Sequence, residues 1–258
     1  MDATPTIAAP AEQAGPNPPD AGGTVTVPKA RQALKAEQLV IDVDKPDVVI
    51  RYAGSPTGES EPATAQAAVV PIADPAPLGL TALALPLFAL SWINIGMMDK
   101  SNVPVVLASL LLYGGLGQLI VALWETRRGN MFGTVAFGTF GCFNLALWYF
   151  LSYGIEDIPK AQHGSAMALF LAVWAVPAAI LWIASFRTTV VTNVIFLLAT
   201  ALFVVAAWGN GAGIDGMLKA GGWIGIALAA TAWYGCAAAL FHHAFGRTVL
   251  PNPSLEKQ

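Results

Sequence analysis

The sequence predicts an all-α membrane protein, a bundle of six transmembrane helices preceded by a largely disordered N-terminal tail. Three observations predict this fold class. First, the chain is 55% hydrophobic and 11% charged, whereas soluble globular proteins have about a quarter charged residues. Second, six apolar segments follow Pro77, each long enough to supply the roughly 20 helical residues that cross a bilayer core. Third, short polar turns separate these segments, so neighbouring helices must run antiparallel.

Residues 1–73 form the predicted tail. Its stretch TPTIAAPAEQAGPNPPDAGGT is rich in Pro, Ala and Gly and buries too little apolar surface to offset chain entropy. The tail lacks the basic start and apolar core of a signal peptide, so no cleavage is expected. The segment LVIDVDKPDVVIRYAG alternates apolar and polar residues, which fits a small hairpin or a segment that adheres to a partner. An isolated hairpin is marginal, so disorder is favoured here too.

The predicted transmembrane domain covers residues 74–251, and residues 252–258 form a C-terminal tail. Lys219 is the one Asp, Glu, Lys or Arg inside a predicted span, near the start of the last. The six spans are Leu78 to Met98, Val103 to Trp124, Met131 to Tyr153, Ser165 to Phe186, Val190 to Trp208 and Met217 to Phe241.

Basic residues in the short loops predict the orientation. One side of the membrane has Lys100, Lys160 and Lys219. The other side, which includes the C-terminal tail, has Arg127, Arg128, Arg187, Arg247 and Lys257. Because the more basic side faces the cytoplasm, both termini are predicted to be cytoplasmic and the protein to lie in the cytoplasmic (inner) membrane.

Several function classes find no support in the sequence. The formal net charge of -3 argues against a nucleic-acid partner, which requires a basic patch. Cys142 and Cys236 lie in apolar runs and are expected to be small buried hydrophobes. A G-x-G-x-x-G string begins at Gly211, but it follows a membrane span rather than a strand, so no dinucleotide cofactor is expected. Neither a metal-type Cys/His spacing nor a G-x-S-x-G or H-E-x-x-H motif is present, so no metal, no cofactor and no enzyme activity are predicted.

A few polar residues lie at membrane depth, where polar groups are expensive and often functional. On the second span, Gln118 and Glu125 share one helix face with Gly114 and Val121. This face either lines a wet path that ends in a proton-titratable carboxylate, or Gln118 bonds a neighbouring helix while Glu125 pairs with Arg127 or Arg128. The polar residues at this depth are Asn94, Tyr113, Gln118, Asn144 and Thr231, with Glu125 at the cytoplasmic end of the second span.

Small residues form a ridge on the sixth span, where Gly221, Gly225 and Ala229 follow one another at four-residue spacing. Close backbone approach is a main source of helix association in lipid. The ridge is therefore expected to pack against another helix of the same subunit or against a second subunit.

The stretch that opens the first span resembles a family signature. DPAPLGL, from Asp74 to Leu80, is similar to the N-P-A-P-L-G-L motif of the acetate uptake transporter family, the succinate–acetate permease-like carriers of bacteria and fungi. YGGLGQLIVALWETRRGNMFGTVAFGTFG, from Tyr113 to Gly141, resembles that family's second and third helices. GGWIGIALAATAWY and FGRTVLP resemble its last helix and tail. The resemblance covers residues 74–251.

The resemblance implies a six-helix protomer that takes up acetate and similar short carboxylates together with protons, in a homohexamer. It places the start of the first helix, with Pro75, Pro77, Leu78 and Gly79, at the anion path. A helix N-terminus offers free N–H groups and a positive dipole end to a carboxylate.

The sequence departs from the family pattern at several path positions. Asp74 replaces the signature Asn and adds a negative charge, and the aromatic Y-G-x-F-W stretch becomes FGCFN at residues 140–144. The bulky positions that narrow the family's path fall at Leu83, Phe140 and Ala199, instead of the usual Phe, Tyr and Leu. These changes predict a wider gate and broader selectivity.

The expected function is therefore a carrier of short carboxylates, driven by proton symport. Two alternatives are a passive pore for small weak acids, and a membrane sensor or assembly partner that acts through its N-terminal tail. The residues predicted to form the substrate path are Pro75, Pro77, Leu78, Gly79, Leu83, Asn94, Tyr113, Gln118, Phe140, Phe143, Asn144 and Ala199, with Glu125 as the proton-coupling candidate.

Overall fold

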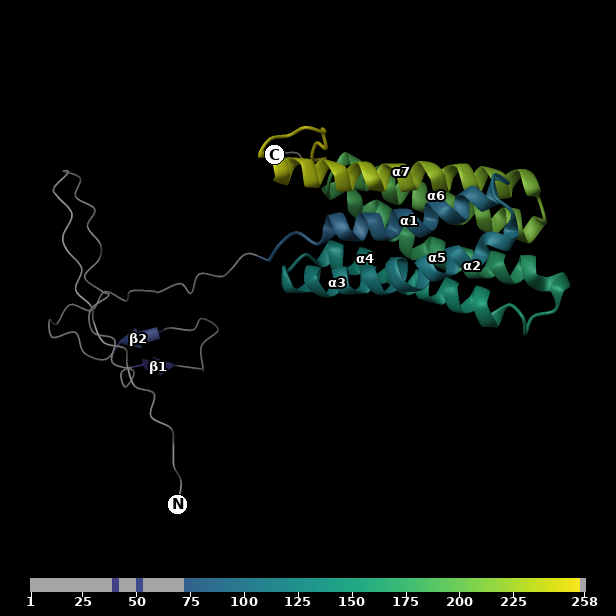
Figure 1. Cartoon of the computed structure of the whole chain (residues 1–258), viewed down its shortest axis with the longest axis horizontal. Helices are drawn as coiled ribbons and strands as arrows, with labels where there is room; N and C mark the ends of the chain where they lie inside the picture. Colours follow the sequence, from purple (N-terminus) through teal and green to yellow (C-terminus); the bar gives the residue numbers. More distant parts are fainter. Residues whose placement is uncertain (1–38, 42–49, 53–71, 256–258) are drawn as a thin grey trace, which may run out of the picture. The chain divides into compact units, whose positions relative to one another are not determined.

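The structure is a computed structural model that describes residues 39–41, 50–52 and 72–255. The chain divides into two units, Met1–Val70 and Pro71–Gln258. In the first unit, strands β1 (Leu39–Ile41) and β2 (Ile50–Tyr52) pair antiparallel, with Val40 opposite Arg51 (Figure 1). This is the hairpin that the sequence offered as an alternative. The remainder of the predicted tail lies outside the described residues.

The second unit contains six helical segments that are long and apolar enough to cross a membrane, which confirms the predicted fold class. Each predicted span overlaps one of these segments, and most ends differ by one to four residues. The segments are Ala76–Asn94, Lys100–Arg127, Met131–Gly154, Lys160–Arg187, Val190–Ala212 and Asp215–Phe245.

Two of the six segments contain a π-helix. The second consists of α2 (Val103–Ser109), the π-helix η4 (Leu110–Gly117) and α3 (Gln118–Arg127), after the short 3-10 turn η3 (Lys100–Asn102). The third is α4 (Met131–Tyr149), which continues as the π-helix η5 (Phe150–Gly154). A π-helix is wider than an α-helix and often marks a functional site.

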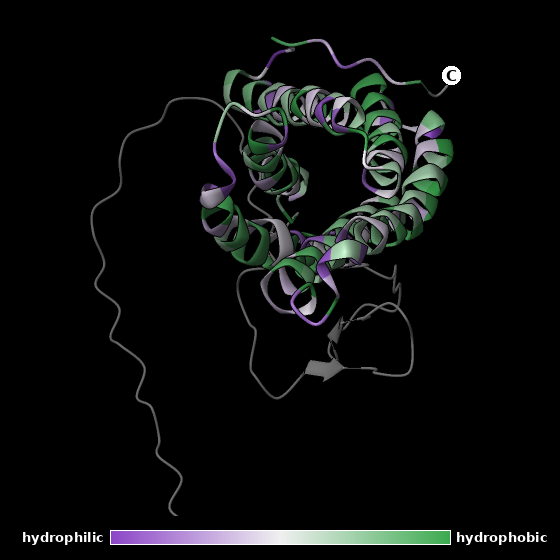
Figure 2. Ribbon diagram, turned by 90° about the vertical axis from the view of Figure 1, so that its right-hand side faces the viewer, coloured by the Kyte–Doolittle hydropathy of each residue, from purple (hydrophilic) through white to green (hydrophobic). Residues whose placement is uncertain are grey.

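The other spans are α1 (Ala76–Asn94), α5 (His163–Ala184), α6 (Val190–Ala212) and α7 (Asp215–Phe245). Helix α1 packs along α7, α7 along α6, α6 along α5, and α3 along α4. Viewed along the helix axes, the spans form a ring (Figure 2). Helix α1 also contacts α4, and residues from all six spans line the larger cavity described below.

The small-residue ridge of α7 packs inside the subunit. A Cβ added to Gly221 would lie 3.6 Å from Ala206 Cβ on α6, and one added to Gly225 would collide with Ser91 Oγ on α1. Gly221, Gly225 and Ala229 are all buried. The ridge therefore lets α1 and α6 approach the α7 backbone closely, as the intramolecular alternative predicts.

The segment after α7 folds back onto the start of α6. Thr188 accepts a hydrogen bond from the Leu255 N–H (2.8 Å), and Val190 N–H donates to the Pro253 carbonyl (3.0 Å). Asn252 Oδ1 accepts from the Val191 N–H (3.2 Å). Two unpaired donors at the N-terminus of a helix are thus satisfied by residues that follow the last span.

Candidate functional site

Two cavities follow one another along α1, and Leu83 and Phe140 line both. The smaller cavity, about 250 Å³, begins beside Ala76 and Leu80 at the start of α1. The larger, about 520 Å³, continues past Leu87 and Leu90 to Asn94 at the other end of the helix. Because α1 is a membrane-spanning helix, the two cavities together follow the full depth of the membrane domain.

Aromatic side chains separate the two cavities. Phe140 on α4 packs against Phe196 and Phe203 on α6, with ring centroids 5.9 and 6.2 Å apart. Phe143 makes a T-shaped contact with Phe203 at 4.9 Å. Ala199 lies between Phe196 and Phe203 along the buried face of α6 and is 1% exposed. We call Leu83, Phe140, Phe196 and Phe203 the aromatic partition.

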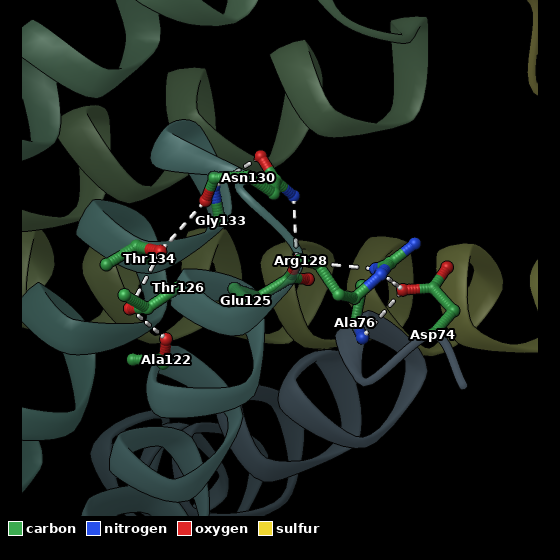
Figure 3. Close-up of polar contacts among 9 residues, drawn as sticks. All are labelled: Asp74, Ala76, Ala122, Glu125, Thr126, Arg128, Asn130, Gly133 and Thr134. Atoms are coloured by element: carbon green, nitrogen blue, oxygen red, sulfur yellow. Dashed lines mark hydrogen bonds and ion pairs between the residues drawn. The ribbon is translucent and has the colours of Figure 1, made fainter. Parts of the chain in front are cut away.

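A polar cluster lies where Ala76, Glu125 and Asn130 line the smaller cavity, which we call the mouth of that cavity. Figure 3 shows the contacts within the cluster. Arg128 Nη1 donates to Asp74 Oδ1 at 2.6 Å and to Glu125 Oε2 at 3.3 Å. Asp74 also accepts from the Ala76 N–H (3.1 Å), which fixes it at the start of α1. The guanidinium group therefore joins a half-exposed carboxylate to a fully buried one.

Asn130 links Glu125 to the start of α4. Its Nδ2 donates to Glu125 Oε2 at 2.9 Å, while its Oδ1 accepts from the Gly133 N–H at 3.1 Å as an N-cap. A Cβ at Gly133 would lie 2.8 Å from Glu125 Cδ, so the absence of a side chain there makes room for the carboxylate. The Asn130 N-cap bonds the Glu125 carboxylate, and Gly133 leaves the space that this carboxylate occupies.

Gln118 and Glu125 both line the smaller cavity and are 0% exposed. Gly114 and Val121, which share their predicted face, are buried as well. Glu125 pairs with Arg128, as the structural alternative predicts, but only through one oxygen. Among the residues that the structure describes, neither polar atom of Gln118 has a hydrogen-bond partner, and Glu125 Oε1 has none either. Bonds to Arg128 and to a neighbouring helix thus account for Glu125 Oε2 but not for Glu125 Oε1 or for the Gln118 amide.

The larger cavity contains other residues of the predicted path. Asn144, 4% exposed, donates from Nδ2 to the Phe140 carbonyl at 2.7 Å. Lys100, Asp215 and Lys219 line the end of the cavity near Asn94. The predicted path residues that line this cavity are Leu83, Asn94, Phe140, Phe143, Asn144 and Ala199.

Five predicted path residues line neither cavity within the described part of the chain: Pro75, Pro77, Leu78, Gly79 and Tyr113. Pro75 is the N-cap of α1, and a Cβ added to Gly79 would collide with the Phe137 ring, so this signature sets helix start and packing. The Tyr113 hydroxyl forms a 2.5 Å hydrogen bond with Thr81 Oγ1. This bond links the π-helix η4 to α1. Their neighbours Ala76 and Leu80 line the smaller cavity instead.

Sequence reasoning missed several residues of the site. Phe196 and Phe203 are buried members of the aromatic partition, and their i and i+7 spacing around Ala199 is the signal that predicts a shared face. Asn130, Thr188 and Thr192 line the smaller cavity, but Asn130 and Thr188 are helix caps and Thr192 lies in the first turn of α6, where such polar residues are ordinary. Within residues 72–255, no three or more His, Cys, Asp or Glu residues gather in a way that could hold a metal ion.

Comparisons with known proteins agree with this architecture. The succinate-acetate/proton symporter SatP of Escherichia coli K12 is 33% identical over 183 residues, which cover 70% of this chain and 95% of SatP. Acetate permease A of Emericella nidulans is 35% identical over 183 residues, or 65% of this chain and 61% of the permease. Ammonia transport outward protein 2 of Saccharomyces cerevisiae is 35% identical over 182 residues, covering 69% and 64% of the two chains.

A solved structure is similar as well. The structure of the bacterial acetate channel SatP superposes with a TM-score of 0.67 at 31% identity, covering 71% of this chain and all of that one. Residues 56–256 match the model of the GPR1/FUN34/yaaH family. The family resemblance of the DPAPLGL stretch and the later motifs is thereby confirmed: this multi-pass membrane protein belongs to the GPR1/FUN34/yaaH family.

Proposed function

We propose that this protein transports acetate and related short-chain carboxylates across the cytoplasmic membrane by proton symport. The observation that carries the proposal is the pair of cavities that share Leu83 and Phe140. A solute that crosses the membrane domain by these cavities meets one apolar barrier, the aromatic partition, with a polar region on either side. The transport named for the related proteins supports the same substrate class.

The charged residues at the outer ends of the two cavities suit a carboxylate and its proton. Lys100 and Lys219 outnumber Asp215 at the end of the larger cavity, so the positive charge there favours anions. Glu125, buried at the smaller cavity with one unpaired oxygen, is placed to take and release a proton. The path between them is lined mainly by Leu, Ile, Phe and Ala, which fit a short aliphatic tail.

A pore is the second candidate, because one related structure is titled an acetate channel while other relatives are named symporters. Uptake of labelled acetate into proteoliposomes, with and without an imposed pH gradient, separates the two. Symport requires uptake to follow the gradient and to fall when Glu125→Gln removes the titratable group. Uptake that ignores both the gradient and the substitution indicates a pore, and absence of uptake contradicts transport altogether and favours the sensor alternative.

The assembly that we propose is a homohexamer with one path per protomer and both termini in the cytoplasm. Large apolar side chains on the outer faces of the spans, such as Val105, Leu123 and Leu169, are exposed in the single subunit. These faces meet lipid or neighbouring subunits. Native mass spectrometry of the detergent-purified protein measures the number of subunits, and any number other than six refutes this assembly.

A further inference from the structure

The deep end of the smaller cavity offers an unusual hydrogen-bonding group. Gln118 begins α3, directly after the π-helix η4, and lies seven residues before Glu125. This spacing places it about 10.5 Å further along the helix axis than Glu125, toward Leu83 and Phe140, which line the same cavity. Gln118 is 0% exposed and lines the smaller cavity together with Leu83, Phe140 and Phe196 of the aromatic partition.

Both polar atoms of this amide lack a partner among the described residues: Oε1, which accepts, and Nε2, which donates. Buried amide groups in folded proteins are normally hydrogen-bonded, because an unpaired one loses its hydration without compensation. Asn144, in the larger cavity, follows the rule and donates to a backbone carbonyl. A ligand that satisfies Gln118 must offer a donor and an acceptor side by side.

The rest of the cavity restricts that ligand further. Among its described lining residues Glu125 is the only ionisable one, and Arg128 and Asp74 lie beyond Glu125 at the mouth. The other elements contribute the Asn130 amide, the hydroxyls of Thr188 and Thr192, and apolar side chains. A volume of about 250 Å³ admits only a small molecule, and charged groups are costly to bury in such surroundings without a counter-ion.

A protonated carboxylic acid meets these requirements. Its O–H donates to Gln118 Oε1 while its C=O accepts from Gln118 Nε2, which closes a ring of two hydrogen bonds. An ionised carboxylate has two acceptors and no donor, so Gln118 Oε1 would face a negative oxygen. We propose that Gln118 recognises the neutral, protonated form of short-chain carboxylic acids at the inner end of the smaller cavity.

This inference rests on the proposed transport of such acids and specifies the form that is bound. The ionised acid takes up one proton to give RCOOH before it reaches the partition, so the acid and its proton cross together. A neutral primary amide of the same size, such as acetamide, offers the same donor and acceptor pair and cannot ionise.

Saturation-transfer NMR on the purified full-length protein tests the inference through binding alone. The apparent affinity for total acetate should rise about tenfold for each unit of decreasing pH above the pKa of acetic acid, because the protonated fraction rises tenfold. Acetamide should compete with acetate, with an affinity independent of pH. Glu125→Gln separates the two groups that can titrate in this cavity: pH dependence that persists in the variant comes from the ligand, and pH dependence that disappears comes from Glu125 and overturns the inference.

Gln118→Met keeps the side-chain volume and removes both hydrogen-bonding atoms. It should weaken acetate and acetamide binding by about tenfold or more, while Gln162→Met, at an exposed glutamine outside the cavities, should leave both unchanged. Acetate binding that is flat or tighter at high pH, or failure of acetamide to compete with wild-type protein, overturns the inference. Binding as expected without acetate uptake refutes the proposed transport but leaves the site intact.

Discussion

Arg128 donates a 2.6 Å hydrogen bond to Asp74, although the two residues are 54 positions apart. The contact closes the start of α1 onto the loop between α3 and α4 at the mouth of the smaller cavity. Asp74 stands where the family signature has Asn, so this chain places a negative charge beside the one Arg that also bonds Glu125. Arg128 bonds both carboxylates. Its guanidinium group is therefore less available to an incoming anion than it would be with a neutral Asn at position 74.

Replacing Asp74 by Asn should release Arg128 for anions at this mouth. We expect acetate exchange in proteoliposomes to show a severalfold lower KM at low ionic strength, and the difference to shrink at high salt, because exposed charges are screened. The thermal midpoint should change little, since exposed ion pairs stabilise proteins by about 0–1 kcal/mol. Asp157→Asn, at an exposed loop acid, is the control. Equal KM values at all salt concentrations would show that Asp74 does not affect the mouth.

Enlarging Ala199 should change the size ranking of substrates. In the wild-type protein we expect propionate, lactate and other acids of three or four carbons to compete well against acetate, because Ala199 leaves space between Phe196 and Phe203. Ala199→Leu fills that space, and one methylene in an apolar site discriminates by about 1–3 kcal/mol. The larger acids should therefore lose tenfold or more in competition assays. Ala172→Leu, at an exposed position on α5, should leave the ranking unchanged; the idea fails if both variants behave alike.

The orientation of the spans can be tested by cysteine labelling. Cys236 is buried as predicted, but Cys142 is exposed, so the prediction was wrong for that residue. Both are first replaced by Ala to remove background labelling. A cysteine at Asp157, between the third and fourth spans, should react with an impermeant reagent in intact cells, and one at Arg187 should react only after lysis. The reverse pattern would place both termini outside and contradict the predicted topology.

Removal of residues 1–70 should leave acetate uptake near the wild-type rate. The deletion ends at the boundary of the first unit and removes none of the residues that line the two cavities. Surface expression is measured alongside uptake. A truncated protein that inserts normally but has lost uptake would assign the N-terminal region a part in transport.

Asn252 should contribute to stability through its bond to the start of α6. Its Oδ1 accepts from the Val191 N–H, so Asn252→Ala leaves that donor unpaired, at a cost of about 1 kcal/mol, as for loss of a helix cap. Asn252→Asp keeps the acceptor and places a negative charge near a helix N-terminus, which is favourable. Thermal unfolding in detergent should therefore rank wild type and Asn252→Asp above Asn252→Ala, and equal midpoints would contradict the role.

Hydrophobic length predicts the six spans well, because a bilayer imposes that length on any helix that crosses it. Helical spacing likewise predicts that Gln118 and Glu125 share a face. The π-helices were not predictable in this way, since a change from i+4 to i+5 hydrogen bonding leaves no periodic mark in eight residues. Tyr113 shows a further limit of sequence-based site prediction. It was predicted to line the substrate path, but its hydroxyl forms a hydrogen bond with Thr81 on a neighbouring helix.

Contacts between distant parts of the chain were equally inaccessible from sequence. The Arg128–Asp74 pair depends on how α1 lies against the loop after α3, and the bond between Val191 and Asn252 spans 61 positions. Neither has a local pattern, because Asp74, Arg128 and Asn252 sit in polar segments that fit any solvent-exposed turn, and Val191 contributes only its backbone N–H. The aromatic partition was half predictable: Leu83 and Phe140 followed from the family motifs, and Phe196 and Phe203 required the packing of α4 on α6.

The segment that returns to α6 has a consequence for biosynthesis. The N-terminus of α6 receives its partners from residues 252–255, which leave the ribosome only after all six spans have been made. Until then the N–H groups of Val190 and Val191 lack these partners. The contacts can therefore form only after every span has been synthesised, and a chain interrupted after α7 carries every span yet lacks them.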